Sequence, residues 1–152
     1  MIAVATPAGL LAVVGQSATA EAWLTIEQDR IDAFADATDD HQWIHVDPSR
    51  AAQGPFGATV AHGYLTLSLV PRLTDGLVEV GGTDLVVNYG LDRVRFVQPV
   101  VVGSRVRAST TIRSAEPTAQ GVRAGFTVTI EIEGAGKPAL VADTVVLYVA
   151  AH

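Results

Sequence analysis

The stretch from Thr38 to Pro48 brings titratable side chains together with apolar ones and lacks the period of a helix or a strand. Asp40 and His45 lie five positions apart in it. On a helix that separation is about 500° of rotation, so the two side chains would point away from each other, and on a strand they would lie on opposite faces. They converge only where the chain follows a bent path, with Trp43 and Ile44 fixed in the core. An Asp and a His that meet beside apolar walls form a candidate general acid/base pair.

The segment before this stretch is expected to be a helix that leads directly into it. Thr25 and Gln28 fit a capping box, in which each side chain bonds to the backbone of the other, so the helix should begin at Thr25 and run to about Thr38. Its apolar residues follow the spacing of one buried face: Ile31, Phe34, Ala35 and Thr38. After the stretch, Asp47 followed by Pro48 predicts the N-cap and first position of a short helix.

A second informative segment runs from Val60 to Leu73. It is apolar nearly all round and carries no charge before Arg72, which predicts a helix buried on all sides. Pro71 should kink this helix or end its regular part. The start of the helix, near His62 and Gly63, would offer unpaired backbone N–H groups, and a glycine there lets a ligand oxygen approach.

The remainder of the chain is expected to form β-sheet. Apolar or alternating segments occur at 85–89, 93–97, 106–112, 122–132 and 140–149, with turn residues between them. No helical period appears after about residue 80, so hairpins should link these strands in antiparallel order. Near the N-terminus, Pro7 to Val14 predicts a short helix that ends at Gly15, and Ala22 to Leu24 a short strand. The expected class is α+β, one domain over residues 1–152 with an antiparallel sheet wrapped around a central helix.

Composition limits the partners. The 152 residues are 49% hydrophobic and 17% charged, with a formal net charge of −6, which argues against nucleic acid or an anionic membrane surface. There is no cysteine, hence no disulfide, thiolate zinc site or cysteine nucleophile. The apolar run from Ile2 to Val14 has no basic residue before it and is too short to span a bilayer. A cytoplasmic location without membrane contact is therefore expected.

At these residues the chain resembles the MaoC-like family of R-specific enoyl-CoA hydratases, also described as 3-hydroxyacyl-thioester dehydratases, and especially its short branch near nodulation protein N. The resemblance covers roughly 23–149. Its most specific parts are Phe34-Ala35-Asp36-Ala37-Thr38, then Asp40 with His45, Val46-Asp47-Pro48, Ala61-His62-Gly63-Tyr64-Leu65, and Arg95-Phe96 followed by Pro99-Val100 and Gly103. It implies a hot-dog fold and reversible hydration of trans-2-enoyl thioesters, carried by coenzyme A or an acyl carrier, to (R)-3-hydroxyacyl thioesters.

The resemblance also implies roles for single residues. Asp40 and His45 would form the catalytic dyad, the backbone N–H of Gly63 would bind the thioester carbonyl, and the protein would act as a homodimer without a cofactor. Candidate substrate contacts are Gln42, His62 and Asn88; for His62 a structural role is favoured, and Asn88 could equally pair across strands. Two departures from the family pattern stand out. Asp39 replaces a common glycine, which leaves open which carboxylate acts, and Gln42-Trp43 replaces Asn-Pro.

Several alternatives remain open at the level of sequence. A thioesterase on the same fold would attack the carbonyl carbon instead of C3, and a non-catalytic acyl-binding or subunit-interaction domain would not need the Asp and His together. Asp40, His45 and His62 could bind a metal by residue type, although their spacing fits no standard ligand motif. Three further expectations concern the surroundings: a solvated His41, a Ser68 that bonds back to a carbonyl, and arginines 93 and 95 on a solvated face or at coenzyme A phosphates.

Overall fold

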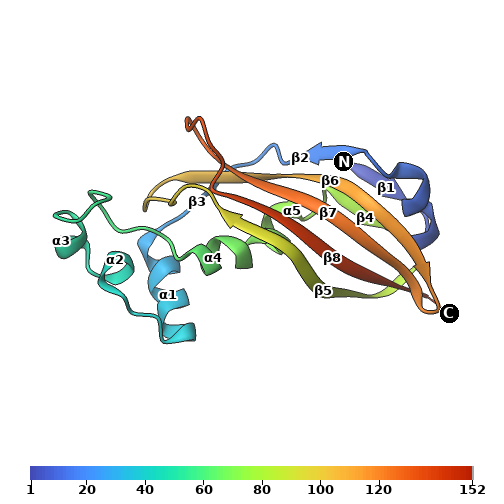
Figure 1. Ribbon diagram of the computed structural model, residues 1–152, viewed down its shortest axis with the longest axis horizontal. Coiled ribbons are helices and arrows are strands. Elements are labelled where there is room, and N and C mark those ends of the chain that lie inside the picture. Colours follow the sequence, from blue (N-terminus) through green and yellow to red (C-terminus); the bar gives the residue numbers. More distant parts are fainter. Residues whose placement is uncertain (152) are drawn as a thin grey trace.

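A long, curved antiparallel sheet dominates the computed structural model, which describes residues 1–151 (Figure 1). Within that range the six-stranded sheet has the order β2-β6-β7-β8-β5, and β3 also pairs with β6. The strands are β2 (Ser17–Thr19), β3 (Leu24–Thr25), β5 (Thr83–Phe96), β6 (Arg105–Thr118), β7 (Gly121–Ile132) and β8 (Leu140–Ala150). A small parallel pair, β1 (Ile2–Val4) with β4 (Val78–Val80), lies beside it. The predicted α+β class and antiparallel pairing are confirmed.

The helices are short and form two groups. Helices α4 (Gly63–Ser68) and α5 (Val70–Thr74) lie along the inner face of the sheet, while α1 (Gln28–Thr38), α2 (Trp43–Val46) and α3 (Pro48–Ala51) gather at one end (Figure 1). A 3-10 helix, η1 (Pro7–Val13), precedes Gly15, whose φ of 91° gives the expected left-handed end. None of the helices within residues 1–151 has the length and hydrophobicity that a bilayer-spanning helix needs.

The core lies between the inner face of the sheet and the helices. Alternate residues of β6, β7 and β8 point inward and pack against leucines of α4, α5 and the turn between them. Burying one leucine side chain stabilises the fold by about 1.5–3 kcal/mol relative to leaving it exposed, so these contacts hold the helices to the sheet. The main members are Leu65, Leu69, Leu73, Val106, Ala108, Ile112, Ile130, Leu140 and Ala142.

The prediction of one helix buried on all sides is wrong. The segment divides at Leu69 into α4 and α5, and one side is open to solvent: Tyr64 is 70% exposed, and Ser68 and Pro71 are also exposed. The apolar composition was interpreted as complete burial, whereas in the single chain the sheet covers only one side. Ser68 does bond back to the carbonyl of Tyr64, as expected (2.7 Å).

The predicted capping box is also wrong. Thr25 belongs to β3, and α1 begins at Gln28 with Glu27 as its N-cap and no side-chain capping bond. The Gln28 side chain instead bonds to groups outside its own helix, described below. By contrast, Asp47 caps α3 as predicted, since its carboxylate accepts from the backbone N–H of Arg50 at 3.0 Å.

Gly121 opens β7 with φ of 152°, and a β-carbon there would overlap the backbone carbonyl oxygen of Tyr148 on β8. Gly121→Ala should therefore lower the free energy of unfolding by about 1–3 kcal/mol, because the backbone or the adjoining strand must shift. Gly136→Ala is the matched control, since nothing lies within 4 Å of the added carbon there. Denaturant unfolding of both variants measures the difference, and equal stabilities would contradict this account of the sheet.

Candidate active site

The segment that follows α1 turns sharply before it reaches the site. Asp39 sits at the C-terminal end of α1 with φ of 57°, the only non-glycine residue of the described chain with a positive φ. This left-handed conformation suits glycine best and tolerates Asp. Asp39 can therefore replace the glycine that is common at this position in the family. The chain then enters α2, where His45 is buried while Trp43 and Ile44 are only half-buried. The expectation that Trp43 and Ile44 sit in the core is therefore wrong.

Three side chains converge behind this turn. One ligand-type atom from each of Asp40, His45 and His62 lies within 4.8 Å of the others. The two imidazole rings stack, with centroids 3.8 Å apart and planes inclined by 22°. Asp40 itself is exposed and accepts weakly from the backbone N–H of Gln42 at 3.4 Å. Asp39 is not a member of this cluster, so Asp40 is the carboxylate beside the histidines.

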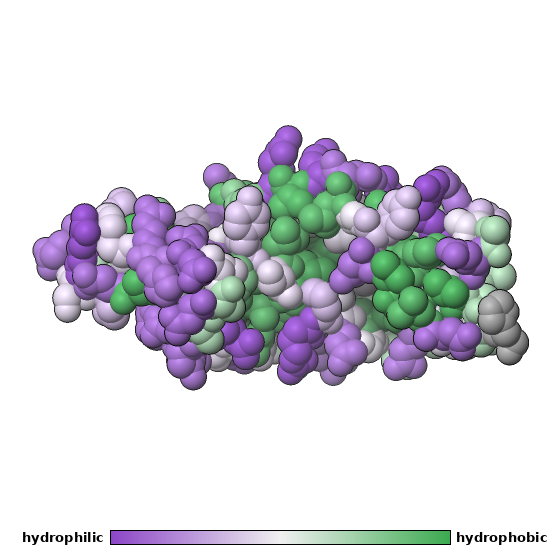
Figure 2. Space-filling view, turned by 90° about the horizontal axis from the view of Figure 1, so that it is seen from below, coloured by the Kyte–Doolittle hydropathy of each residue, from purple (hydrophilic) through white to green (hydrophobic). Residues whose placement is uncertain are grey.

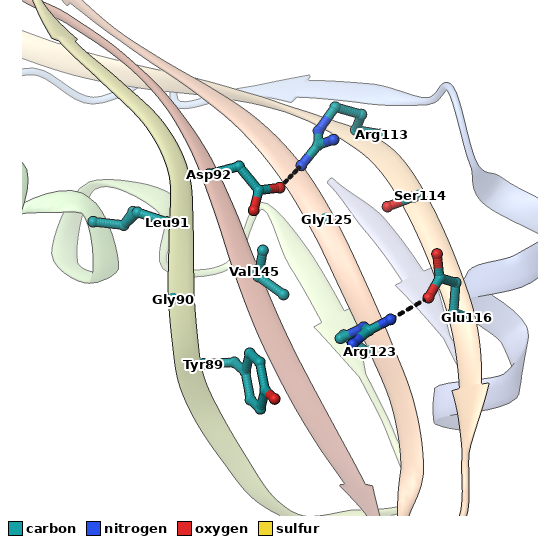
Figure 3. A pocket seen from close by; sticks show the side chains of 10 residues that line it. All are labelled: Tyr89, Gly90, Leu91, Asp92, Arg113, Ser114, Glu116, Arg123, Gly125 and Val145. Atoms are coloured by element: carbon teal, nitrogen blue, oxygen red, sulfur yellow. Dashed lines mark hydrogen bonds and ion pairs between the residues drawn. The ribbon is translucent and has the colours of Figure 1, made fainter.

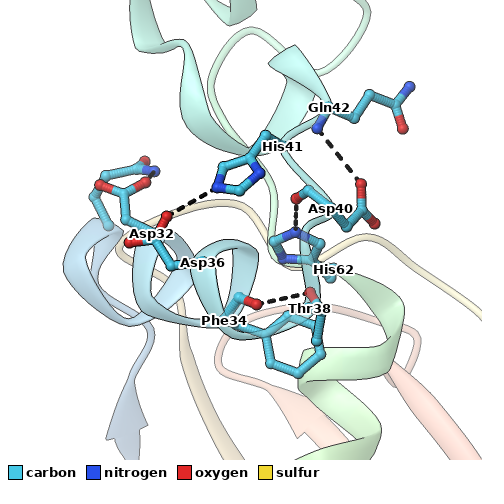
Figure 4. A network of polar contacts seen from close by, with 9 residues as sticks. Asp32, Phe34, Asp36, Thr38, Asp40, His41, Gln42 and His62 are labelled. Atoms are coloured by element: carbon cyan, nitrogen blue, oxygen red, sulfur yellow. Dashed lines mark hydrogen bonds and ion pairs between the residues drawn. The ribbon is translucent and has the colours of Figure 1, made fainter.

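Backbone carbonyls orient both imidazoles. His45 Nδ1 lies 2.6 Å from the Val60 carbonyl oxygen. His62 Nε2 lies 2.9 Å from the Asp40 carbonyl oxygen, a contact drawn in Figure 4. A carbonyl only accepts, so these nitrogens carry the protons, and the Nε2 lone pair of neutral His45 is left free. His62 Nδ1 is buried with no hydrogen-bond partner in residues 1–151. The hydrogen bond from His62 therefore holds the Asp40 backbone in place.

Burial sets the charge of His45. Desolvation is the main cause that lowers the pKa of His45 below its usual 6.5, and the nearby His62 lowers it further, while the Val60 carbonyl and the Asp40 carboxylate act in the opposite direction. The imidazole is thus neutral at neutral pH. A neutral imidazole with a free Nε2 can accept a proton, as a general base must.

His45 lines a pocket of about 340 Å³ between α4 and the end of β5. Gly63 lines the same pocket at the first position of α4, where the backbone N–H has no intrahelical acceptor. A β-carbon on Gly63 would lie 3.2 Å from the ring of Phe96, which forms the opposite wall. An oxygen entering this pocket could accept from Gly63 N–H beside the imidazole. The other walls are mostly apolar, with Thr66 and Gln98 as polar members: Ile44, Phe56, Val60, Ala61, Thr66, Gln98, Pro99, Val100 and Ala139.

Gln28 ties the histidine segment to the rest of the protein, and sequence reasoning missed this role. Its amide nitrogen donates to the backbone carbonyl of His45 at 2.7 Å and to Asp32 at 2.8 Å, and its amide oxygen accepts from the hydroxyl of the buried Thr59. The signal was present as a glutamine in the first turn of α1, but the capping-box interpretation assigned its side chain elsewhere.

The other sequence candidates lie away from the pocket. Gln42 is exposed, and its side chain points away from the cluster in Figure 4. Asn88 lies on β5 and lines two hollows that do not include His45. His41 is exposed but pairs with Asp36 at 2.8 Å, a hydrogen bond that raises the pKa of His41. Of the three proposed substrate contacts, the structure brings only His62 to the dyad.

A separate hollow of about 420 Å³ on the outer face of the sheet is lined by ion pairs (Figure 3). Arg113 bonds to Asp92 at 2.8 Å, and Arg123 bonds to Glu116. Nearby on that face, Arg93 pairs with the buried Asp143 at 3.1 Å. Each of these three arginines already has a carboxylate partner, whereas the exposed Arg95 bonds only to the carbonyl of Val94. This surface is far less suited to chemistry than the histidine pocket.

A metal ion is compatible with the donor types of the cluster and with its hydrogen bonds. Asp40, His45 and His62 could each offer one atom. One nitrogen of each imidazole donates to a carbonyl and the other is free, while the Asp40 carboxylate is exposed. The arrangement supplies three donors at most, so a bound ion would keep open positions for water.

The chain belongs to the MaoC-like dehydratase family. Residues 10–135 match the family model described as MaoC like domain. The chain is 52% identical over 144 residues to 3-hydroxyacyl-thioester dehydratase Z of Mycobacterium tuberculosis, covering 94% of this chain and 95% of that protein. It is 44% identical over 137 residues to nodulation protein N of Rhizobium leguminosarum bv. viciae, covering 88% and 85%.

Solved structures confirm the hot-dog fold expected from the resemblance. An (R)-hydratase from A. caviae involved in PHA biosynthesis matches with a TM-score of 0.73 at 28% identity, over 89% of this chain and 96% of that one. The R-hydratase PhaJ1 from Pseudomonas aeruginosa matches with a TM-score of 0.74 at 23% identity, over 95% and 86%. The architecture is thus the hot-dog fold of MaoC-like hydratases.

Replacing Gln28 by Met should leave the His45 carbonyl and the Thr59 hydroxyl without their partner. Each unpaired buried group costs about 1–3 kcal/mol, so we expect a clear loss of stability together with lower turnover as the histidine segment loosens. Gln53→Met is the control, since Gln53 is exposed. Thermal unfolding and turnover of the two variants are compared; a Gln28→Met protein as stable and active as Gln53→Met would contradict the role given to Gln28.

Proposed function

We propose that this protein catalyses the reversible hydration of trans-2-enoyl thioesters to (R)-3-hydroxyacyl thioesters. The observation that carries the proposal is the convergence of Asp40 and His45 beside a pocket that also contains the Gly63 N–H. The relative that is 52% identical over nearly the whole chain carries the name 3-hydroxyacyl-thioester dehydratase, and the (R)-hydratases share the fold. Both facts support a hydro-lyase acting on acyl thioesters.

The chemistry of hydration fits these groups. Water must lose a proton as its oxygen attacks C3, C2 must gain a proton, and negative charge passes through the thioester oxygen meanwhile. Asp40 and His45 hold the water between them; one accepts its proton, and the dyad returns a proton to C2, so that no net proton is consumed. The free Nε2 of neutral His45 is a suitable acceptor. In dehydration the same groups act in reverse.

The Gly63 N–H is proposed to stabilise the enolate oxygen. A single positioned donor of this kind contributes on the order of 3 kcal/mol in other enzymes. The apolar walls of the pocket exclude water from the oxygen and strengthen that interaction. No cofactor takes part in this scheme; the coenzyme A or acyl-carrier thioester is the substrate. A cytoplasmic location, where such thioesters are made and consumed, stays a prediction.

A thioesterase is the competing activity for this site. It would release a free thiol, whereas hydration removes the enoyl absorbance and leaves the thioester intact. Following both signals with one short enoyl-CoA decides between them. Thiol release without loss of the enoyl group would contradict the proposed function. Absence of both signals would favour a non-catalytic acyl-binding domain.

We also propose that two copies form a dimer through β5. This strand is at the edge of the sheet and exposes large apolar side chains, as does α4 beside it: Tyr64, Leu85, Val86, Tyr89 and Leu91. Green, hydrophobic residues gather on the face seen in Figure 2, which includes this edge. A long apolar edge is seldom left unpaired, and an isologous contact between two β5 strands would cover it.

For the dyad, Asp40→Asn and His45→Gln should each lower turnover by at least about 100-fold, because both groups act in the same step. Their melting temperatures should stay close to that of the unchanged protein. The matched controls are the neighbours: Asp39→Asn and His41→Gln should have much milder effects. A damaging Asp39→Asn with a tolerated Asp40→Asn would assign the chemistry to the other carboxylate.

For the oxyanion donor, Gly63→Ala should lose turnover out of proportion to stability, because the β-carbon obstructs the approach of the thioester oxygen. Phe96→Leu tests whether crowding of the ring alone explains the loss. His62→Ala should instead lower stability and turnover together, since it removes the ring stacked on His45 and the bond to the Asp40 carbonyl. Normal turnover in folded Gly63→Ala would remove this residue from the mechanism.

For the dimer, light scattering should give about twice the chain mass of 15.9 kDa. Leu85→Glu together with Tyr89→Glu should shift the mass toward that of one chain, because charges in the apolar edge oppose pairing. Asp84→Glu on the same strand leaves the charge unchanged and serves as the control. A protein that is monomeric and fully active at micromolar concentration would contradict the proposal.

A further inference from the structure

A second hollow, of about 190 Å³, lies between α5 and the inner face of the sheet, away from His45. The side facing the helix is formed by Val70, Pro71 and Thr74, and the sheet side by strands β5 to β8. The walls are apolar, as a binding site for an acyl chain requires, except at a group of polar side chains: Asn88, Thr110, Thr144 and Tyr148. These four residues are named the polar cluster below.

The strand register places the polar cluster on one face. Thr110 pairs with Val128, Thr144 with Phe126, and Tyr148 with Val122, and these partners point into the core. Directly opposite residues share a face of the sheet. Asn88 pairs with Val146, which lines the same hollow. The cluster therefore gathers side chains from three strands, β5, β6 and β8, around one cavity.

The polar groups of the cluster have no partner within residues 1–151. Thr74 in the same hollow donates to its own helix at 2.8 Å, but the structure gives no side-chain hydrogen bond to Asn88, Thr110, Thr144 or Tyr148. Thr110 is 3% and Tyr148 9% exposed, and burial raises the pKa of Tyr148 to about 12, so its hydroxyl stays a neutral donor. Asn88 is exposed and Thr144 is half-buried. Among residues 1–151 the only fully buried side-chain N or O atom without a partner is His62 Nδ1, so the polar atoms of the cluster are open to the hollow and can pair with an occupant that carries an oxygen.

A neighbouring hollow extends this one toward α4, whose first residue, Gly63, lines the catalytic pocket. The neighbouring hollow is lined by Leu67, Val70, Pro71 and Asn88. From Gly63 to the residues 71–74 is eight to eleven helical positions, about 12 to 17 Å at about 1.5 Å per residue. A zigzag chain with carbon–carbon bonds of about 1.5 Å covers that span with roughly ten carbons.

We propose that the polar cluster binds an oxygen-bearing far end of the acyl chain, a hydroxyl or carbonyl group roughly ten carbons from the thioester. The inference rests on the proposed function and names its substrate class. A hydroxyl can donate and accept, and a ketone can accept from Tyr148 and the threonines. A saturated tail would enter the hollow and leave these groups unpaired, which costs affinity.

The experiment compares three enoyl thioesters of coenzyme A: crotonyl, a saturated-tail substrate of about twelve carbons, and the same chain with a hydroxyl near its far end. The unchanged protein should show a kcat/KM for the hydroxylated chain at least about tenfold above that for the saturated chain. Tyr148→Phe combined with Thr110→Val should abolish this preference and leave crotonyl turnover unchanged, because crotonyl does not reach the hollow.

Thr129→Val is the matched control, since Thr129 lies on the opposite face of β7 from Phe126 and Val128. It should keep the preference for the hydroxylated chain. Equal or better use of the saturated chain by the unchanged protein, with crotonyl hydration intact, would overturn this inference alone and indicate that water or the second subunit pairs with the cluster. Absence of crotonyl hydration would overturn the proposed function and this inference with it.

Discussion

The hydrogen bond from His45 Nδ1 to the Val60 carbonyl is the contact on which the site depends. Val60 also donates its backbone N–H to the Ile44 carbonyl at 3.0 Å, and the next residue, Ala61, donates its N–H to the Val100 carbonyl at 2.8 Å. The short extended segment before α4 is thus held between the histidine segment on one side and the end of the sheet on the other. One stretch of backbone therefore fixes the tautomer of the base and the position of Gly63 together.

Much of this arrangement could be predicted from local patterns. The alternating residues of β6 and β7, the cap at Asp47 and the left-handed Gly15 report interactions within a few positions of the chain, and each appeared where expected. Strands 85–89 and 93–97 proved to be one strand, β5, because bulges near Asn88 and Leu91 carry the pairing through the interruption. The convergence of Asp40 and His45 was predicted only because a regular helix or strand would point the two side chains away from each other.

What the sequence could not supply are contacts between distant segments. Gln28 bonds to His45 and Thr59, 17 and 31 positions away, and no local period reveals such a partner. The exposed side of α4 was missed for a related reason, since apolar composition does not distinguish a surface covered by the same chain from one that another chain would cover. The stack of His45 on His62 brings together the segment after α1 and the segment before α4. At the level of sequence, these two segments were interpreted separately.

That stack affects how the two imidazoles share charge. With ring centroids 3.8 Å apart, the neighbouring imidazole adds to desolvation in lowering the pKa of His45. A proton taken up by His45 during turnover therefore sits on a ring whose surroundings disfavour the charge. A base that holds its proton poorly in this way is a strong acid in the following half-step, so the stack favours rapid onward transfer and keeps the protonated enzyme short-lived.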